Sequence, residues 1–171
     1  MKLIVAVDRH WGIGKDNKLL FSLKTDMAFF KKTTTGKIVV MGKNTFLSFP
    51  GGPLKNRINV VLTKENFQGC ICVKSMDELM RTISKYDTDE VYVIGGASMY
   101  RTMLPYCETA LITKVDAVGD ADTYFPDLDL DKNWELTQKT EAEDTFPIAF
   151  CEYKNKNLTE YIYENLSLIH I

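Results

Sequence analysis

Residues 90–104 have the sequence Glu-Val-Tyr-Val-Ile-Gly-Gly-Ala-Ser-Met-Tyr-Arg-Thr-Met-Leu. Its first part, 90–94, is a short continuous apolar run, which is typical of a strand buried on both faces of a sheet. Two glycines follow, and residues 97–104 predict a helix that stops before Pro105. Because a buried strand that leads directly into a helix is the repeating unit of parallel sheets, the stretch indicates an α/β protein.

Similar units come before this stretch. The apolar runs that predict buried strands are residues 2–7, 37–42, 57–63 and 69–73. The helices expected among them are one from about Lys24 to Lys32, a short one at 43–49 capped by Asn44 or Thr45, and one carrying Leu79 to Ile83 behind the capping box Ser75 to Glu78. Residues 8–18 predict a long loop without regular structure.

Beyond residue 104 the pattern changes. Strands are expected at 110–116, 134–139 and 148–153, with no long helices between them, so we expect all of them to pair as antiparallel additions. The whole chain therefore predicts one α/β domain, with a mixed, mostly parallel, twisted sheet and helices on both faces. Ligands of such sheets bind at the carboxyl ends of the strands.

Composition excludes several classes of protein. The chain has 171 residues, of which 45% are hydrophobic and 26% charged, with a net charge of −2. The charged residues show no basic excess, so a nucleic-acid partner is not expected. Neither a signal peptide nor a membrane span is expected, because the apolar runs are too short, so we expect a cytoplasmic protein.

The cysteines and histidines predict no metal site. The four cysteines have no zinc-ligand or redox spacing, and only two histidines are present to join them: Cys70, Cys72, Cys107, Cys151, His10 and His170. We expect reduced thiols packed in the core.

The most informative side chain lies in residues 19–32, Leu-Leu-Phe-Ser-Leu-Lys-Thr-Asp-Met-Ala-Phe-Phe-Lys-Lys. In a helix from about Lys24, Asp26 shares a face with Phe30, and no lysine of the helix is placed to pair with it. A carboxylate turned toward a core is costly unless another part of the fold or a ligand compensates it. The alternative is a half-exposed acid of the first turn, which the helix dipole favours.

Two glycine motifs resemble nucleotide-binding signatures only in part. Residues 12–17 lack the third glycine of the dinucleotide fingerprint, and residues 36–44 have the wrong spacing for a phosphate loop, so both are rejected. In contrast, residues 42–45 and 95–98 each follow a strand and open a helix, where free N–H groups suit a pyrophosphate. Each of these two motifs, taken alone, is also consistent with a plain tight turn.

Taken together, these residues resemble the dihydrofolate reductase family from residue 1 to about 154. The stretches that carry the resemblance are 7–8 with 13–19, the helix with Asp26 and Phe30, 40–45, 53–54 with Arg57, 93–96 with Tyr100, and 111–113 followed by 122–126. The family's eight-stranded mixed sheet agrees with the pattern above. The resemblance implies reduction of 7,8-dihydrofolate by NADPH, with antifolates as expected inhibitors. We further expect a monomer.

The resemblance assigns the substrate site. It makes Asp26 the only ionisable side chain of the pterin pocket, with Thr113 behind it, and gives Arg57 the α-carboxylate of the glutamate tail, which suits a guanidinium fork. The expected catalytic group is Asp26, Phe21, Leu19, Thr113 and Tyr100. The expected substrate-binding residues are Ile4, Val5, Asp26, Met27, Phe30, Lys31, Phe49, Leu54, Arg57, Ile94 and Thr113.

The resemblance also assigns the cofactor site. This site consists of the loop over the nicotinamide, the two glycine turns and a pocket for the 2'-phosphate. In the family, the Gly95–Gly96 peptide bond is cis. The expected cofactor-binding residues are Ala6, Ile13, Gly14, Asn17, Leu19, Gly42, Lys43, Asn44, Thr45, Leu62, Thr63, Lys64, Lys74, Ile94, Gly95, Gly96, Ala97, Ser98, Met99, Tyr100 and Thr123.

Some positions depart from the family pattern. Phe21 stands where the family usually has a tryptophan whose N–H holds a water, and Ser98 where many relatives have an arginine for the 2'-phosphate. Two other hypotheses are weighed. One is a pyrimidine or pterin reductase of the same fold, whose substrate lacks glutamate, and the other is a nucleotide-binding module without catalysis. Asp26 and Arg57 argue against the first, and Phe21 is the only feature that favours the second.

The chain divides into a domain at 1–157 and an extra tail at 158–171. The tail is expected to be disordered, to form a short docking helix, or to lie outside the natural gene product. Its removal is expected to leave activity unchanged and to change stability by less than about 1 kcal/mol.

Overall fold

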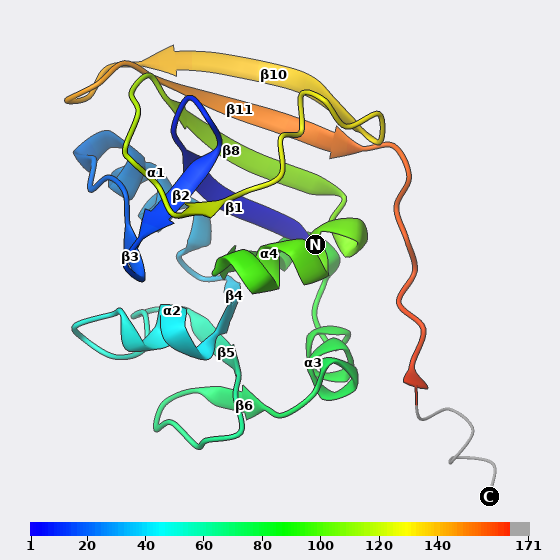
Figure 1. Ribbon diagram of the computed structural model, residues 1–171. Coiled ribbons are helices and arrows are strands. Elements are labelled where there is room, and N and C mark those ends of the chain that lie inside the picture. The colour runs from blue at the N-terminus through cyan, green and yellow to red at the C-terminus, as the bar shows by residue number, and fades with distance from the viewer. Residues whose placement is uncertain (165–171) are drawn as a thin grey trace, which may run out of the picture.

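The computed structural model describes residues 1–164 and contains an eight-stranded sheet (Figure 1). Its strands, in spatial order, are β10 (Trp134–Ala142), β11 (Ile148–Asn155), β8 (Thr109–Val115), β1 (Lys2–Val7), β7 (Val91–Gly95), β4 (Ile38–Gly42), β5 (Ile58–Leu62) and β6 (Ile71–Val73). In this order, the strands β8, β1, β7, β4, β5 and β6 are mutually parallel. Strand β11 is antiparallel to both of its neighbours, β10 and β8. The predicted α/β fold is confirmed.

Helices cover both faces of the sheet. They are α1 (Lys24–Thr34), α2 (Lys43–Leu47), α3 (Met76–Ile83) and α4 (Ala97–Met103), with short 3₁₀ turns at Thr88–Glu90 and Leu104–Tyr106. Neighbouring strand residues point to opposite faces. Thus Val40 packs in the cluster with α3 and α4, whereas Met41 packs in the cluster with α1 and α2. Within the described residues, no helix combines the length and apolar character that a membrane crossing needs.

The pairing of β8 and the cap of α2 differ from the prediction. Strand β8 was expected to be antiparallel but pairs parallel with β1, in the register Ala6↔Thr113. The local pattern of a strand does not identify its neighbour, and β1 lies far away in sequence. The N-cap of α2 is Gly42, not Asn44 or Thr45, because β4 runs directly into the helix and leaves no residue between them to cap it.

The predicted loop at 8–18 contains regular structure. It folds back as β2 (Gly12–Lys15) and β3 (Lys18–Leu19), and β2 also pairs with β9 (Thr123–Tyr124) to form a small three-stranded sheet. The hairpin turn is made by Asp16 and Asn17, whose φ angles are 51° and 61°. Aspartate and asparagine tolerate this left-handed conformation better than most residues, so the pair was a usable hairpin signal that the prediction overlooked.

The described part of the tail, up to residue 164, packs on the body of the protein near α3 (Figure 1). Thr159 N donates to the Pro105 carbonyl at 3.0 Å, and the Tyr161 hydroxyl donates to the buried carboxylate of Asp77 in α3. The Tyr161 ring also meets Tyr106 edge-on, with centroids 5.5 Å apart. The part of the tail prediction that concerns 165–171 lies outside the described residues.

These contacts revise the expectation that the tail adds little stability. Truncation after Asn157 should lower the free energy of unfolding by about 1 to 3 kcal/mol, because it removes an aromatic contact and leaves Asp77 without the Tyr161 hydroxyl. Truncation after Glu164 is the matched control, because it keeps these contacts. Thermal and denaturant unfolding of both truncations measures the difference. Equal stability would show that residues 158–164 contribute nothing.

Candidate active site

The fold brings the end of α1 that carries Asp26 against the sheet. Leu23, the N-cap of α1, is buried and packs with Val115 of β8 and Ile148 of β11. Because this contact fixes the first turn of the helix, the Asp26 carboxylate lies near the Thr113 side chain, which acts to lower its pKa. Thr113 is itself buried near the carboxyl end of β8. The structure therefore joins the two residues that the sequence assigned to the pterin pocket.

The Asp26 carboxylate is partly buried, and its pKa is raised above the ordinary value. Burial is the main cause, and the negative charge of Asp144 adds to it, while the Thr113 side chain acts in the opposite direction. Among residues 1–164, no basic group forms an ion pair with Asp26. An acid that only served the helix dipole would have a lowered pKa. Asp26 lies in the first turn, yet burial raises its pKa.

Apolar residues of the predicted substrate site gather on the same face of the sheet. They form one packed cluster with α1 and α2 that includes Ile4, Phe30, Phe49, Leu54 and Ile94. Two predicted residues differ from this group. Val5 packs in the cluster on the opposite face, as expected for the strand neighbour of Ile4, and Met27 is 56% exposed.

Arg57 lies at the start of β5, and the protein already holds its side chain. Nε donates to the Lys55 carbonyl at 2.9 Å, and Nη1 donates to Thr34 Oγ1 at 3.0 Å. Thr34, at the end of α1, is fully buried and donates in turn to the Phe30 carbonyl at 2.8 Å. The guanidinium is therefore oriented while other N–H groups remain available, as a fork for a carboxylate requires.

The two glycine turns lie side by side, because β4 and β7 are neighbours, with Met41 opposite Gly95. The Gly95–Gly96 peptide bond is cis, as the family resemblance implied. Both glycines approach Thr45 of α2 closely: a Cβ on either would lie 3.2 to 3.3 Å from Thr45 Oγ1. Neither α2 nor α4 has a side-chain cap. The turns thus present backbone without side chains at one edge of the sheet.

Tyr100 connects this edge to β1. Its hydroxyl donates to the Ile4 carbonyl at 2.8 Å, and burial raises its pKa far above the ordinary value, with the charge of Asp26 adding to the shift. The hydroxyl is therefore a neutral donor that is already engaged. Its role in this structure is to hold β1 and α4 together.

The predicted 2'-phosphate pocket is at the end of β5. Thr63 is buried, and its Oγ1 accepts from Glu65 N at 3.1 Å, while Lys64 is exposed. Lys43 forms an ion pair with Glu65. Further predicted residues are exposed: Lys31, Asn44, Lys74, Ser98 and Leu19, the last being 82% exposed.

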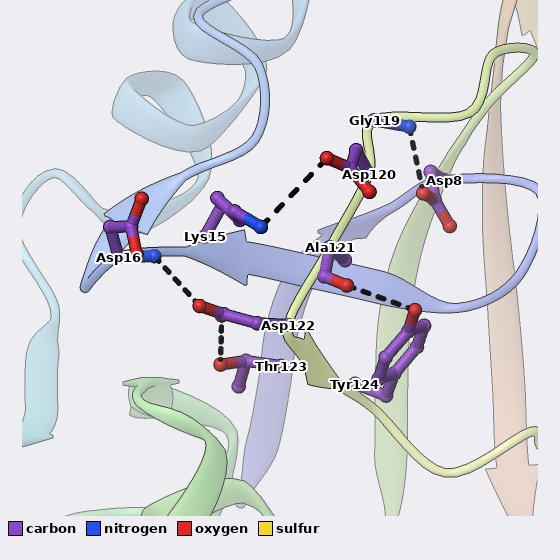
Figure 2. A network of polar contacts seen from close by, with 9 residues as sticks. All are labelled: Asp8, Lys15, Asp16, Gly119, Asp120, Ala121, Asp122, Thr123 and Tyr124. Atoms are coloured by element: carbon purple, nitrogen blue, oxygen red, sulfur yellow. Dashed lines mark hydrogen bonds and ion pairs between the residues drawn. The ribbon is translucent and has the colours of Figure 1, made fainter.

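A polar network joins the 9–23 loop to the segment 117–124 (Figure 2). Asp122 Oδ2 accepts from Asp16 N at 3.0 Å, and Asp122 N donates to the Gly14 carbonyl at 3.0 Å. The Thr123 hydroxyl donates to the other carboxylate oxygen of Asp122, Oδ1, at 2.9 Å and is therefore part of the network. The loop that carries Ile13 and Gly14 is therefore held in place by backbone hydrogen bonds to a second loop.

Asp8 anchors the other end of this network (Figure 2). It is 4% exposed, and its carboxylate accepts from the backbone N–H groups of His10 and Gly12, both at 2.8 Å, and of Gly119 at 3.0 Å. Burial acts to raise the pKa of Asp8, but these hydrogen bonds outweigh it and lower the pKa. Gly12 has no room for a side chain, because a Cβ would lie 2.5 Å from that of Ala121.

The sequence prediction missed three acids near the site: Asp8, Asp122 as a loop anchor, and Asp144. A signal existed for Asp8, an acid directly after a buried strand and before a glycine. Asp144 gave none, because its partner in α1, Thr25, is 119 residues away in sequence.

Phe21, the departure from the family pattern, is partly buried. Its ring meets Phe146 edge-on, with centroids 5.6 Å apart, and Gly119 lies against it so closely that a Cβ would be 3.1 Å from its Cζ. Phe21 therefore serves as an apolar contact between the 9–23 loop and the β10–β11 hairpin.

Comparison with known proteins agrees with this geometry. Residues 1–155 match the family described as dihydrofolate reductase. Dihydrofolate reductase of Bacillus subtilis is 36% identical over 92% of this chain and 95% of its own, and that of Haemophilus influenzae is 38% identical over 89% and 86%. Dihydrofolate reductase from Enterococcus faecalis, solved in complex with NADP(H) and RAB-propyl, superposes with a TM-score of 0.81 at 28% identity, covering 90% of this chain and 95% of its own. With identities above 30% over nearly its whole length, this chain belongs to the dihydrofolate reductase family.

Proposed function

We propose that this protein transfers a hydride from C4 of NADPH to C6 of 7,8-dihydrofolate, with a proton added at N5, to give tetrahydrofolate for one-carbon metabolism. The observation that carries the proposal is Asp26: a partly buried carboxylate with a raised pKa, beside an apolar cluster and without a basic partner among the described residues. A ligand with two parallel N–H donors would supply the missing partner.

In this proposal the protein itself does little covalent chemistry, since bound NADPH supplies the hydride. Asp26 binds the pteridine and provides a fixed negative charge that favours a more cationic ring. Arg57 holds the glutamate tail, and the 9–23 loop covers the reacting atoms and excludes water. We assign the proton at N5 to water rather than to Asp26.

The residues present fit the cofactor. The adjacent glycine turns each lead from a strand into a helix without a side-chain cap, so their N–H groups are suited to a pyrophosphate. A Cβ at Gly95 or Gly96 would crowd Thr45 Oγ1, which favours glycine at both positions. Lys43, Asn44 and the residues 97–100 would surround it. Thr63 and Lys64 would take the 2'-phosphate.

Cofactor choice gives a prediction. NADPH should be preferred over NADH, and Lys64→Gln should reduce the preference by roughly 5- to 10-fold, because it removes one charge at the 2'-phosphate. Raising the salt concentration should reduce the preference of the wild type, since the pair is partly exposed. The measurement is the ratio of kcat/KM for the two cofactors. Lys132→Gln, at an exposed position outside the site, is the control; an unchanged ratio in Lys64→Gln would move the 2'-phosphate to another lysine.

The other hypotheses make different predictions for one assay. NADPH oxidation is followed at the nicotinamide absorbance band with dihydrofolate, with a dihydropterin that lacks glutamate, or with no acceptor. Strong preference for dihydrofolate supports the proposal. Equal use of both acceptors indicates a pterin reductase, against which the oriented Arg57 argues, and no oxidation indicates a nucleotide-binding module.

We also propose that the protein acts as a monomer in the cytoplasm. Support for a reducing compartment comes from the cysteines: Cys70, Cys72, Cys107 and Cys151 are all free thiols.

A further inference from the structure

We propose that Asp144, in the hairpin between β10 and β11, is a positioning residue for Asp26: it caps α1 from outside the helix and holds its first turn against the sheet. This inference rests on the proposed function, which gives Asp26 its role in substrate binding.

Helix α1 has no cap of its own. The first N–H groups of a helix have no partner within it and require one from elsewhere. The N-cap residue is Leu23, whose side chain cannot accept a hydrogen bond. The neighbouring hydroxyl of Ser22 donates to Met27 Sδ at 3.3 Å and does not cap the helix.

Asp144 supplies the missing cap. Its Oδ2 accepts from Thr25 N at 2.7 Å, and the Thr25 hydroxyl donates to the Glu143 carbonyl at 3.0 Å. Its Oδ1 accepts from Thr145 N at 2.8 Å, which fixes the orientation of the carboxylate. A carboxylate at a helix N-terminus is favourable both as an acceptor and toward the helix dipole. Because Asp26 directly follows Thr25, these contacts define where the Asp26 carboxylate lies.

Aromatic contacts hold the same hairpin on both sides of the first turn. Phe146 meets Phe21 before α1 begins, and the Phe150 ring of β11 lies 4.4 Å, centroid to centroid, from Phe29 within α1. The hairpin is therefore packed on α1, and the cap sits on a rigid support.

The charge of Asp144 also acts on Asp26. The groups that interact with Asp26 from other elements are Thr113 of β8 and Tyr100 of α4, which are neutral, and Asp144. On its own helix, Lys24 and Lys31 form no ion pair with it. Burial acts to raise the pKa of Asp144 itself, but hydrogen bonds from Thr145 and Thr25 lower it below the ordinary value. Asp144 is thus ionised while Asp26 still titrates, and it favours the protonated form of Asp26.

Two substitutions separate the cap from the charge. Asp144→Asn keeps an acceptor for Thr25 N but removes the charge, and Asp144→Ala removes both. Glu143→Gln is the matched control, since it removes the same charge from the adjacent, exposed side chain. The measurements are KM for dihydrofolate, the pH profile of kcat/KM, and the carbon-13 NMR titration of the Asp26 carboxyl in the free protein.

In Asp144→Asn, we expect KM within about two-fold of the wild type and an Asp26 titration that moves to lower pH. In Asp144→Ala, KM should rise roughly 3- to 10-fold, because the first turn is no longer held, and the titration should move as well. The proposal is overturned by an unchanged KM in Asp144→Ala, or by an Asp26 titration that moves no further in Asp144→Asn than in Glu143→Gln. Should Asp144→Ala fail to fold, the NMR comparison of the other two variants decides. A wild type that does not reduce dihydrofolate would instead refute the proposed function.

Discussion

Replacing Asp26 by asparagine should lower kcat/KM for dihydrofolate about 100- to 1,000-fold, while leaving the free protein at least as stable at pH 7. Activity falls because the pteridine loses its fixed counter-charge. Stability does not fall, because the carboxylate is partly buried without a basic partner among the described residues, and burial raises its pKa. The remaining activity should increase toward acid pH, where the substrate itself is more often protonated.

The raised pKa of Asp26 gives stability a defined dependence on pH. A group whose pKa is raised by folding contributes most stability below the unfolded value of about 3.9, and this contribution is lost as the pH rises through the folded value. Asparagine does not titrate. The melting temperature of Asp26→Asn relative to the wild type should therefore increase as the pH rises from about 4 through the folded pKa and then stay constant.

Thermal melts and pH–rate profiles of both proteins test this prediction. Asp89→Asn, at an exposed position on the 3₁₀ turn Thr88–Glu90, is the control and should change neither measurement. A variant that was less stable than the wild type at pH 7 and equally active would make Asp26 a structural acid, contrary to the site assignment.

Replacing Arg57 by leucine should weaken dihydrofolate binding by about 2 to 4 kcal/mol, seen as a higher KM, and hardly change the kinetics of a dihydropterin that lacks glutamate. The reason is the orientation of the guanidinium, which the Lys55 carbonyl and Thr34 hold at the start of β5. Only a substrate with a carboxylate tail should need it.

Arg57→Lys is the informative control for this prediction. Lysine keeps the positive charge but cannot bind a carboxylate through two parallel N–H groups, so most of the effect on KM should remain. Because Arg57 also contacts buried Thr34, melting temperatures are needed to exclude a general loss of structure. Equal losses on both substrates would show that Arg57 is structural.

Much of the fold could be predicted, because its strands are apolar runs and its helices begin at recognisable signals. Ser75 does accept from Glu78 N at 3.1 Å, as the capping box predicts. The direction of β8 could not be predicted in this way, since a strand's own residues carry no information about a neighbour more than a hundred positions away. The small sheet around Asp16 and Asn17 was missed for a different reason, because a two-residue turn inside a polar loop was read as lack of structure.

Candidate site residues could be predicted only where the signal for them lies within one short stretch of sequence. Asp26 could be identified from helical spacing and an uncompensated charge, and the glycine turns from their place after strands. The role of Arg57 depends on family resemblance, because nothing in its neighbours indicates a carboxylate ligand. Asp122 and Asp144 each accept from a backbone N–H group more than a hundred residues distant, and Asp8 accepts from Gly119 in addition to its near neighbours His10 and Gly12; local sequence does not reveal the distant contacts.

The most direct test of the proposed reaction is the fate of the transferred hydrogen. The protein is incubated with dihydrofolate and NADPH carrying deuterium at both hydrogens of C4, and the folate product is examined by mass spectrometry and NMR. The proposed reaction predicts one deuterium per product molecule, located at C6 of tetrahydrofolate, and a steep loss of this product with Asp26→Asn. Product without deuterium at C6, or equal deuterium transfer by Asp26→Asn, would contradict the account.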